Sequence, residues 1–246
     1  SRSAAPAIIR KPTLDEERRL WREGHEWVAG IDEVGRGAWA GPVSVGVAVI
    51  RAGTSKRSLP KELRDSKLLS EDRREAIFEE VGAWCAAWSV GHATAAECDR
   101  LGMTAALRLA STRGLAAVGI VPDAILLDGP FDFLRSSNRA LPGLQPCEID
   151  QIEVEIDQIS AKVVPLVAAD QKCAAVAAAS VLAKVVRDRF MRDEATHFPQ
   201  YHFERNKGYP SWAHKMALRG YGLSAIHRRT WVFVEGVPWG SGALGR

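Results

Sequence analysis

The feature that most constrains this chain is the segment from Gly30 to Pro42, GIDEVGRGAWAGP, which places two acidic residues and a glycine-rich turn between two apolar stretches. Those stretches carry the β-branched and aromatic residues typical of strands: Trp27, Val28 and Ile31 before the turn, and Val43, Val45, Val47, Val49 and Ile50 after it. We therefore expect two strands, with Asp32 and Glu33 at the end of the first. Neighbouring strand residues point to opposite faces, so the strand should end or bulge there if both acids face one site.

The glycines of this segment limit which binding loop it can form. Gly35 and Gly37 let backbone N–H groups approach a ligand, and the guanidinium of Arg36 offers a planar donor fork for phosphate or sugar oxygens. The spacing of Gly35, Gly37 and Gly41 does not match GxGxxG, and the Gly-Lys-Ser/Thr end of a P-loop is absent. Both nucleotide-binding loops are therefore excluded, and a plain hairpin with a polar turn remains the alternative.

Composition permits nucleic-acid binding without requiring it. The 246 residues suffice for one main core with a small subdomain, and the formal net charge is only +3. No stretch is long and apolar enough for a membrane helix, and the first residues lack the apolar core of a secretory signal, so we expect a cytoplasmic protein. Cys85, Cys98, Cys147 and Cys173 follow no CxxC spacing, which argues against a zinc site and a disulfide framework.

Periodicity and capping signals predict the remaining elements. We expect helices at 13–26, opened by a Thr13 and Glu16 capping pair, at 70–83, at 97–118 and at 171–194, and strands at 86–93, 124–127 and 161–168. Acidic and apolar residues alternate at 145–157, which predicts an exposed strand or hairpin with an acidic face at 148–157. We assign that segment no role.

Two further acids follow predicted strands. Asp128 ends the strand at 124–127 and precedes a Gly-Pro pair, which by itself indicates a turn, although a carboxylate at the carboxyl end of a parallel strand is also well placed for a site. Asp170 precedes the alanine-rich helix at 171–194. There it could serve as the N-cap of the helix or as an active-site acid, and spacing alone does not decide between them.

Four motifs, in order, resemble the type 2 ribonucleases H (RNase HII) of bacteria. GIDEVGRGAWAGP resembles the family signature Asp-Glu-x-Gly-Arg-Gly followed closely by Gly-Pro, and DSKLLS at 65–70 resembles Asp-Ser-Lys-Lys-Leu-Ser, with Leu68 in place of the second lysine. The segment that Asp170 opens resembles the family helix with Ala-Ala-Ser-x-x-Ala-Lys-x-x-Arg-Asp, and Lys-Gly-Tyr at 207–209 precedes His-Arg-Arg at 227–229. The resemblance runs from about residue 28 to residue 231.

The resemblance implies an α/β protein with a ribonuclease H-like fold. Its mixed five-stranded sheet flanked by helices would form a catalytic domain at 1–195, and a small helical C-terminal segment at 196–246 would close over the substrate and end in a loose tail. The implied active site consists of Asp32, Glu33, Asp128 and Asp170, which would bind Mg²⁺ or Mn²⁺ because clustered carboxylates repel and hard oxygen ligands favour these ions.

The implied reaction is hydrolysis of the RNA strand of RNA/DNA hybrids and incision on the 5′ side of single ribonucleotides embedded in duplex DNA. Two-metal-ion catalysis would leave 5′-phosphate and 3′-hydroxyl ends. Gly35, Arg36 and Gly37 should bind the 2′-hydroxyl, Lys67 a phosphate, and the ring of Tyr209 the next deoxyribose. Without the resemblance, Lys67 is a solvated residue before a helix and Tyr209 a wedge between subdomains.

Charged residues near the C-terminus are expected at the surface. A basic surface would be supplied by Lys207, Lys215, Arg219, Arg228 and Arg229. Asp188 and Glu194 should form surface pairs with Arg187 and Arg192. We expect a monomer that binds hybrids or ribonucleotide-containing DNA and does not bind membranes.

Two other functions remain open. A structure-specific DNA nuclease or a type 3 ribonuclease H would share the acids, and cleavage of an all-DNA duplex would identify the former. A catalytically silent hybrid-binding protein would show no metal-dependent turnover, although intact acids at the matching positions argue against it.

Overall fold

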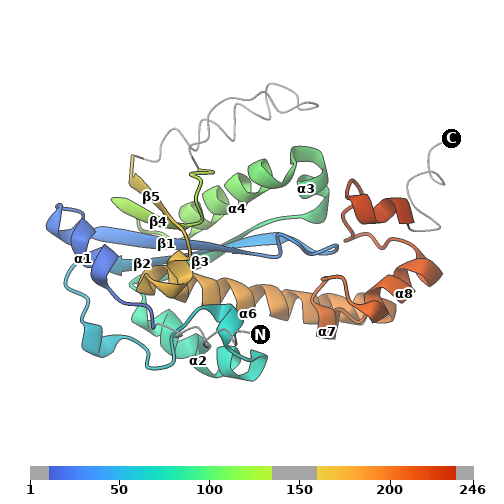
Figure 1. The fold of residues 1–246 in the computed structure, drawn as a ribbon, viewed down its shortest axis with the longest axis horizontal. Helices are drawn as coiled ribbons and strands as arrows, with labels where there is room; N and C mark the ends of the chain where they lie inside the picture. Colours follow the sequence, from blue (N-terminus) through green and yellow to red (C-terminus); the bar gives the residue numbers. More distant parts are fainter. Residues whose placement is uncertain (1–10, 135–159, 237–246) are drawn as a thin grey trace, which may run out of the picture.

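The computed structural model describes residues 11–134 and 160–236, in which one five-stranded sheet carries helices on both faces (Figure 1). The strands lie in the order β3-β2-β1-β4-β5; the β1–β2 and β2–β3 pairs are antiparallel, and the β1–β4 and β4–β5 pairs are parallel. Their bounds are β1 (Trp27–Val34), β2 (Val43–Arg51), β3 (Ala87–Ala93), β4 (Ala124–Asp128) and β5 (Lys162–Leu166). The mixed five-stranded sheet expected from the sequence is confirmed.

Two pairs of helices enclose the sheet. α6 (Ala174–His197) and α2 (Glu71–Trp84) pack on one face, and α3 (Ala95–Leu101) and α4 (Met103–Ala117) pack on the other, below and above the sheet in Figure 1. α6 comes so close to β1 that a Cβ atom at Gly30 would lie 2.2 Å from the backbone of Ala175. The alanine-rich sequence of α6 permits this approach, because small side chains let the helix backbone lie against the strand.

The predicted strands at 86–93, 124–127 and 161–168 are confirmed as β3, β4 and β5. The helix predicted at 70–83 is confirmed as α2, and the hydroxyl of Ser70 caps it by accepting a hydrogen bond from the N–H of Arg73.

Two other helix predictions are wrong in their boundaries. The single helix expected at 97–118 is divided into α3 and α4 at Gly102, whose φ of 75° ends the first helix. α1 (Asp15–Arg22) begins without the expected capping pair: no side chain caps it, and the Thr13 hydroxyl donates to Asp15 at 2.8 Å. The first boundary differs because a turn glycine interrupts an otherwise apolar helical pattern, and the second because the Thr13 hydroxyl forms a local hydrogen bond in place of the expected cap.

The chain after α6 folds back on the end of that helix. α7 (Phe203–Asn206) and α8 (Trp212–Tyr221) lie beside the C-terminal end of α6 (Figure 1) and share an apolar cluster with Met191 and Ala40. Because Ala40 belongs to the turn between β1 and β2, this packing places the C-terminal part against the glycine-rich segment. The acidic strand predicted at 145–157 and the tail after residue 236 lie outside the described residues.

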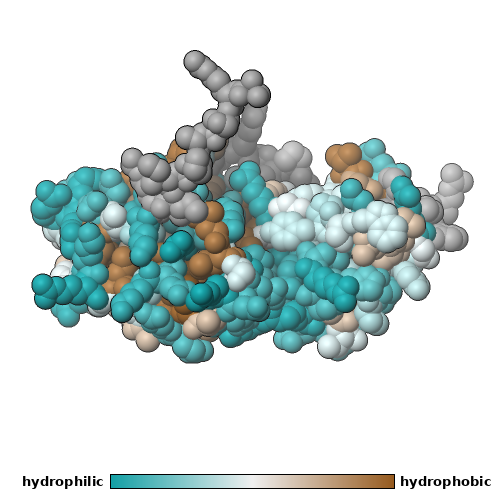
Figure 2. Space-filling model, turned by 60° about the horizontal axis from the view of Figure 1, so that its bottom comes forward, coloured by the Kyte–Doolittle hydropathy of each residue, from teal (hydrophilic) through white to brown (hydrophobic). Residues whose placement is uncertain are grey.

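The face shown in Figure 2 is mainly hydrophilic, and its hydrophobic residues gather mostly in the left half.

Cys85, Cys98 and Cys173 are free and buried. Within 11–134 and 160–236, no helix combines the length and the apolar character needed to cross a bilayer.

Candidate active site

Asp32 and Glu33 lie at the C-terminal end of β1, the central strand of the sheet. The ladder of β1 with β2 continues without a bulge to Val34, where β1 ends, so the acids lie at the end of the strand as expected. The ladder with β4 stops earlier, where Ile31 faces Leu127. Beyond that point no strand of the described residues pairs with this side of β1, and carboxylates that leave opposite faces can still approach the same region.

Asp128 and Asp170 come from the next strand and from the turn before α6. Asp128 ends β4, and its Oδ1 accepts a hydrogen bond from the N–H of Ala169 at 2.7 Å. That bond anchors a 3₁₀ turn, Ala169–Gln171, in which Asp170 is buried. α6 starts only at Ala174 with Cys173 in the N-cap position, so the capping role that spacing allowed for Asp170 is wrong.

The pKa shifts show that these carboxylates are close enough to affect one another. Burial, together with Glu33 and Asp128, raises the pKa of Asp32 well above its usual range. Burial and then Asp128 raise the pKa of Glu33, against the opposing effect of Arg36, and burial and Asp128 raise the pKa of Asp170 to about 6. The structure therefore brings together all four acids that the sequence motifs indicated.

Lys67 directs its ammonium toward this acidic group. Its Nζ lies 3.5 Å from Oδ2 of Asp170. Although burial lowers the pKa of Lys67, nearby carboxylates led by Asp32 raise it above the usual value. Asp65, which the sequence reasoning left without a role, orients the lysine: its Oδ1 accepts from the N–H of Lys67 at 2.9 Å, and its Oδ2 accepts from Nε2 of Gln171 at 3.3 Å.

Two buried hydroxyls near Asp32 were also missed from the sequence. Ser180 opposes the rise in the pKa of Asp32, and the Ser180 hydroxyl donates to the hydroxyl oxygen of Ser66 at 2.8 Å. The signal for both was their place inside motifs, because Ser66 directly precedes Lys67 and Ser180 belongs to the Ala-Ala-Ser of α6. Carboxylate positioning is therefore shared between α6 and the loop before α2.

The donor set suits a hard divalent cation. Asp32, Glu33, Asp128 and Asp170 offer carboxylate oxygens alone, the ligands that Mg²⁺ and Mn²⁺ prefer. The raised pKa values of Asp32, Glu33 and Asp170 show that positive charge nearby would stabilise their ionised forms. In the part of the chain that the structure describes, no three histidine, cysteine or acidic side chains form a ready-made ligand group. The acids therefore fit such an ion by the chemistry of their ligand atoms.

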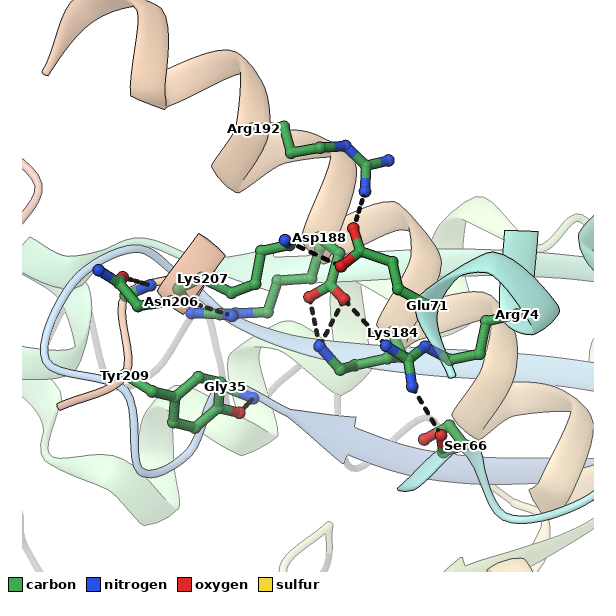
Figure 3. Close-up of polar contacts among 12 residues, drawn as sticks. Gly35, Ser66, Glu71, Arg74, Lys184, Asp188, Arg192, Asn206, Lys207 and Tyr209 are labelled. Atoms are coloured by element: carbon green, nitrogen blue, oxygen red, sulfur yellow. Dashed lines mark hydrogen bonds and ion pairs between the residues drawn. The ribbon is translucent and has the colours of Figure 1, made fainter. Parts of the chain in front are cut away.

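The glycine-rich turn lies next to the acids. Gly35 has a φ of 85°, and its N–H donates to the hydroxyl of Tyr209 at 3.1 Å (Figure 3). Arg36 and Gly37 are exposed, a Cβ atom at Gly37 would meet nothing within 4 Å, and the Arg36 guanidinium lies 3.7 Å from Glu33. The tip of the turn is thus open to a ligand, and the Tyr209 ring is half-buried beside it.

A buried histidine pair fixes the backbone of Tyr209. The ring nitrogens Nε2 of His214 and His227 lie 2.9 Å apart, and the N–H of Ser224 donates to Nδ1 of His227 at 2.9 Å. Because that Nδ1 accepts, the proton of neutral His227 lies on Nε2, and His214 accepts there and donates from Nδ1 to the carbonyl of Tyr209 at 2.9 Å. Burial lowers the pKa of both rings, that of His227 to about 3, which keeps them neutral.

Several charged residues expected at the surface are buried. Asp188 lies between Lys184 and Arg74 in Figure 3, and Arg187 donates to backbone carbonyls instead of pairing at the surface. Lys207 is buried with its ammonium 3.1 Å from Glu71, which also pairs with Arg192, and Arg228 is fully buried. The expected basic surface keeps only its exposed members, Lys215, Arg219 and Arg229.

Spacing along a helix does not reveal which of its faces other segments cover. The part of the chain after α6 covers the face of α6 that carries Arg187, and α2 covers Asp188. Arg74 adds a further link, because its buried guanidinium donates to the carbonyl of Ser66 at 2.9 Å and lies 3.6 Å from Asp188.

The chain is similar to known proteins in both sequence and structure. A family model described as ribonuclease HII matches residues 29–234. A ribonuclease HII of Streptomyces avermitilis is 42% identical over 228 residues, which cover 92% of this chain and 86% of that protein. The crystal structure of ribonuclease H2 from Pyrococcus horikoshii OT3 superposes with a TM-score of 0.65 at 27% identity and covers 86% of this chain and 96% of that one.

A more distant solved structure supports the fold alone. Bst-RNase HIII in complex with Mn²⁺ superposes with a TM-score of 0.55 at 19% identity, covering 80% of this chain and 63% of that one.

Proposed function

The chain belongs to the ribonuclease HII family, a family of metal-dependent endonucleases, and from that premise we propose that it cleaves the RNA strand of RNA/DNA hybrids and also incises duplex DNA on the 5′ side of a single embedded ribonucleotide. The 2′-hydroxyl is the one group that distinguishes such a site from the surrounding DNA. The observation that carries the proposal is the position of an open, N–H-bearing glycine turn directly beside the four acids.

We assign the chemistry to Asp32, Glu33, Asp128 and Asp170. These residues would hold two Mg²⁺ or Mn²⁺ ions, which when bound supply Lewis-acid stabilisation of the leaving 3′ oxygen and an activated water, giving 5′-phosphate and 3′-hydroxyl ends. Ser180 favours the ionised form of Asp32, because it opposes the rise in the pKa of that acid.

Recognition falls to the turn and to Tyr209. The backbone N–H groups of Arg36 and Gly37 would donate to the 2′-hydroxyl oxygen, and the half-buried ring of Tyr209 would contact the next, deoxyribose, sugar. Gly37 suits this role because nothing lies within 4 Å of the position where a side chain would begin.

Binding of the phosphate backbone falls to Lys67 and the C-terminal part. Lys67 keeps 69% of its side chain exposed, so its ammonium can contact a phosphate next to the acids. The segment at 196–246 would close over the duplex with its exposed basic residues, Lys215, Arg219 and Arg229. We propose a cytoplasmic monomer that acts on nucleic acid without a membrane.

The test uses a DNA duplex with one ribonucleotide, an all-DNA duplex and a uniform hybrid, each with Mg²⁺, with Mn²⁺ and with chelator. We expect metal-dependent incision immediately 5′ of the ribonucleotide, no cutting of the all-DNA duplex, and loss of incision in Asp32→Asn. Cutting of the hybrid alone would remove the single-ribonucleotide activity and the recognition role of the turn. Cutting of the all-DNA duplex would indicate a DNA nuclease, and no cutting at all a silent binding protein.

A further inference from the structure

Two buried guanidiniums support the glycine-rich turn from beneath. Arg228 donates to the carbonyls of Arg36 at 2.8 Å and Gly35 at 2.6 Å, with a longer contact of 3.4 Å to Gly41. Arg187 of α6 donates to the carbonyls of Pro42 at 2.9 Å, Ala40 at 3.2 Å and Lys207 at 3.0 Å. Both side chains are fully buried, and within the described residues neither forms an ion pair.

Burial of two unpaired guanidiniums costs free energy, which indicates that the shape of the guanidinium is needed at these positions. A buried cation without a carboxylate partner loses its hydration and gains no ion pair. Burial accordingly lowers the pKa of Arg187 to about 10 and lowers that of Arg228. In return, the guanidinium spreads five donors over three nitrogens in a rigid plane and can hold carbonyl groups of different peptides at separate positions, whereas the three donors of an ammonium all lie on one nitrogen.

Nearly every N–H group of the turn is also paired. The N–H of Gly35 donates to Tyr209, that of Ala38 to the carbonyl of Gly35, those of Trp39 and Ala40 to the carbonyl of Gly208, and that of Gly41 to the carbonyl of Ile226. Among the described residues, none accepts a hydrogen bond from the N–H of Arg36 or of Gly37. These two adjacent, exposed donors are what the turn offers to a ligand.

The direction of these two donors follows from Arg228. In a trans peptide the C=O and the N–H point in opposite directions, and the described residues contain no cis peptide. Arg228 holds the carbonyls of Gly35 and Arg36, which belong to the same two peptides as the N–H groups of Arg36 and Gly37. The inward pull on the carbonyls therefore turns both N–H groups away from the guanidinium, toward solvent.

We propose that Arg228, supported by Arg187, is the positioning residue for ribonucleotide recognition: it fixes the peptides at 35–37 so that two N–H groups face the 2′-hydroxyl oxygen. This inference rests on the proposed function, since it assigns the orientation of the same turn. Neither arginine touches the substrate in this arrangement, and each acts through the backbone.

The experiment compares Arg228→Lys and Arg187→Lys with Arg189→Lys, an exposed arginine two positions further along α6 that pairs with Glu75. Anisotropy in chelator measures the affinity of each protein for a duplex with one ribonucleotide and for the matching all-DNA duplex. We expect the wild type and Arg189→Lys to prefer the ribonucleotide duplex at least tenfold, and Arg228→Lys to lose that preference while its affinity for the all-DNA duplex changes less than twofold. Arg187→Lys should weaken the preference by a smaller factor.

The outcomes separate the two claims. A folded Arg228→Lys that keeps the wild-type preference overturns the positioning role and leaves the proposed function standing. A wild type without any preference overturns the recognition role of the turn itself.

A second measurement does not depend on whether the lysine variants fold. In the wild-type protein, amide resonances of Arg36 and Gly37 should shift on titration with the ribonucleotide duplex more than with the all-DNA duplex. The amides of Gly35 and of 38–41 should respond less, because they are already paired. Equal responses to the two duplexes would overturn the inference.

Discussion

At the scale of single residues, Tyr209 shows how one side chain can serve recognition and structure together. Its hydroxyl accepts from the N–H of Gly35 at 3.1 Å, its carbonyl accepts from His214 at 2.9 Å, and its ring lies 5.5 Å from the Arg187 guanidinium. Both ends of the residue are therefore fixed, and only the ring remains for a substrate. The orientation in which the ring could contact a deoxyribose is thus constrained by a hydrogen bond that the sequence did not indicate.

Substitutions at Tyr209 should separate its two contributions. Tyr209→Phe keeps the ring and removes one net hydrogen bond of about 1 kcal/mol, so we expect kcat/KM on the single-ribonucleotide duplex to fall about fivefold. Tyr209→Ala also removes a stacking surface of about 1 to 3 kcal/mol, and the fall should reach about a hundredfold. Steady-state kinetics on the same duplex measures both. Equal losses in the two variants would show that the ring makes no contact of its own.

At the scale of elements, α6 organises the site along its length. Its N-terminal end follows the turn that contains Asp170, its middle supplies Ser180 to Asp32, and its C-terminal half supplies Arg187 to the glycine-rich turn. Each of these contacts requires the helix backbone to lie close to β1. The close approach depends on glycine at Gly30, because its Cβ position is taken by the backbone of α6.

Gly30→Ala should destabilise the protein by about 2 kcal/mol or more, because backbone atoms at 2.2 Å cannot move aside as a flexible side chain can. The matched control is Gly220→Ala in α8, where nothing lies within 4 Å of the new methyl group and the higher helix propensity of alanine should stabilise by up to about 1 kcal/mol. Urea denaturation followed by circular dichroism measures both changes. Similar small effects at the two positions would show that α6 does not depend on this contact.

At the scale of the whole molecule, the start of the described chain caps the helix that carries the site. Oε1 of Glu17 in α1 accepts from the N–H of Ala175 at 2.9 Å, and Thr13 exchanges backbone hydrogen bonds with Lys172 and Ala174 on either side of Cys173. This distant carboxylate takes the place at the start of α6 that the sequence suggested for Asp170. Oε2 of Glu17 is buried and has no hydrogen-bond partner among the described residues, and burial raises the pKa of Glu17 to about 7.

This raised pKa predicts a definite dependence of stability on pH. Between pH 4.5, the ordinary pKa, and about pH 7, Glu17 holds a proton in the folded protein that it has released in the unfolded chain. The stabilisation of the folded state by protonated Glu17 is therefore complete below pH 4.5 and is lost as the pH rises to 7. The loss amounts to about 3 kcal/mol. The free energy of unfolding of the wild type, relative to Glu17→Gln, should fall by that amount from pH 4 to pH 8.

Chemical denaturation at a series of pH values measures this difference. Glu16→Gln is the matched control, because Glu16 is a half-exposed neighbour on the same helix that pairs with Arg19. A difference between wild type and Glu17→Gln that stays constant with pH would contradict the assignment.

The sequence by itself determined the strands, their order of appearance and the identity of the acids, because alternation, turn glycines and motif order are local properties. Asp32, Glu33 and Asp128 could be located in this way, as could the cap of α2 at Ser70. Only the tertiary structure decided which polar groups are buried and which groups they hydrogen-bond. The charged residues of α6 lie in its C-terminal half, and their spacing does not reveal that Arg187 and Asp188 are buried while Arg189 is exposed. The partners of Arg228 and Glu17 lie more than 150 residues away along the chain. Such contacts form only when segments that are distant in the sequence pack together, so local sequence patterns cannot predict them.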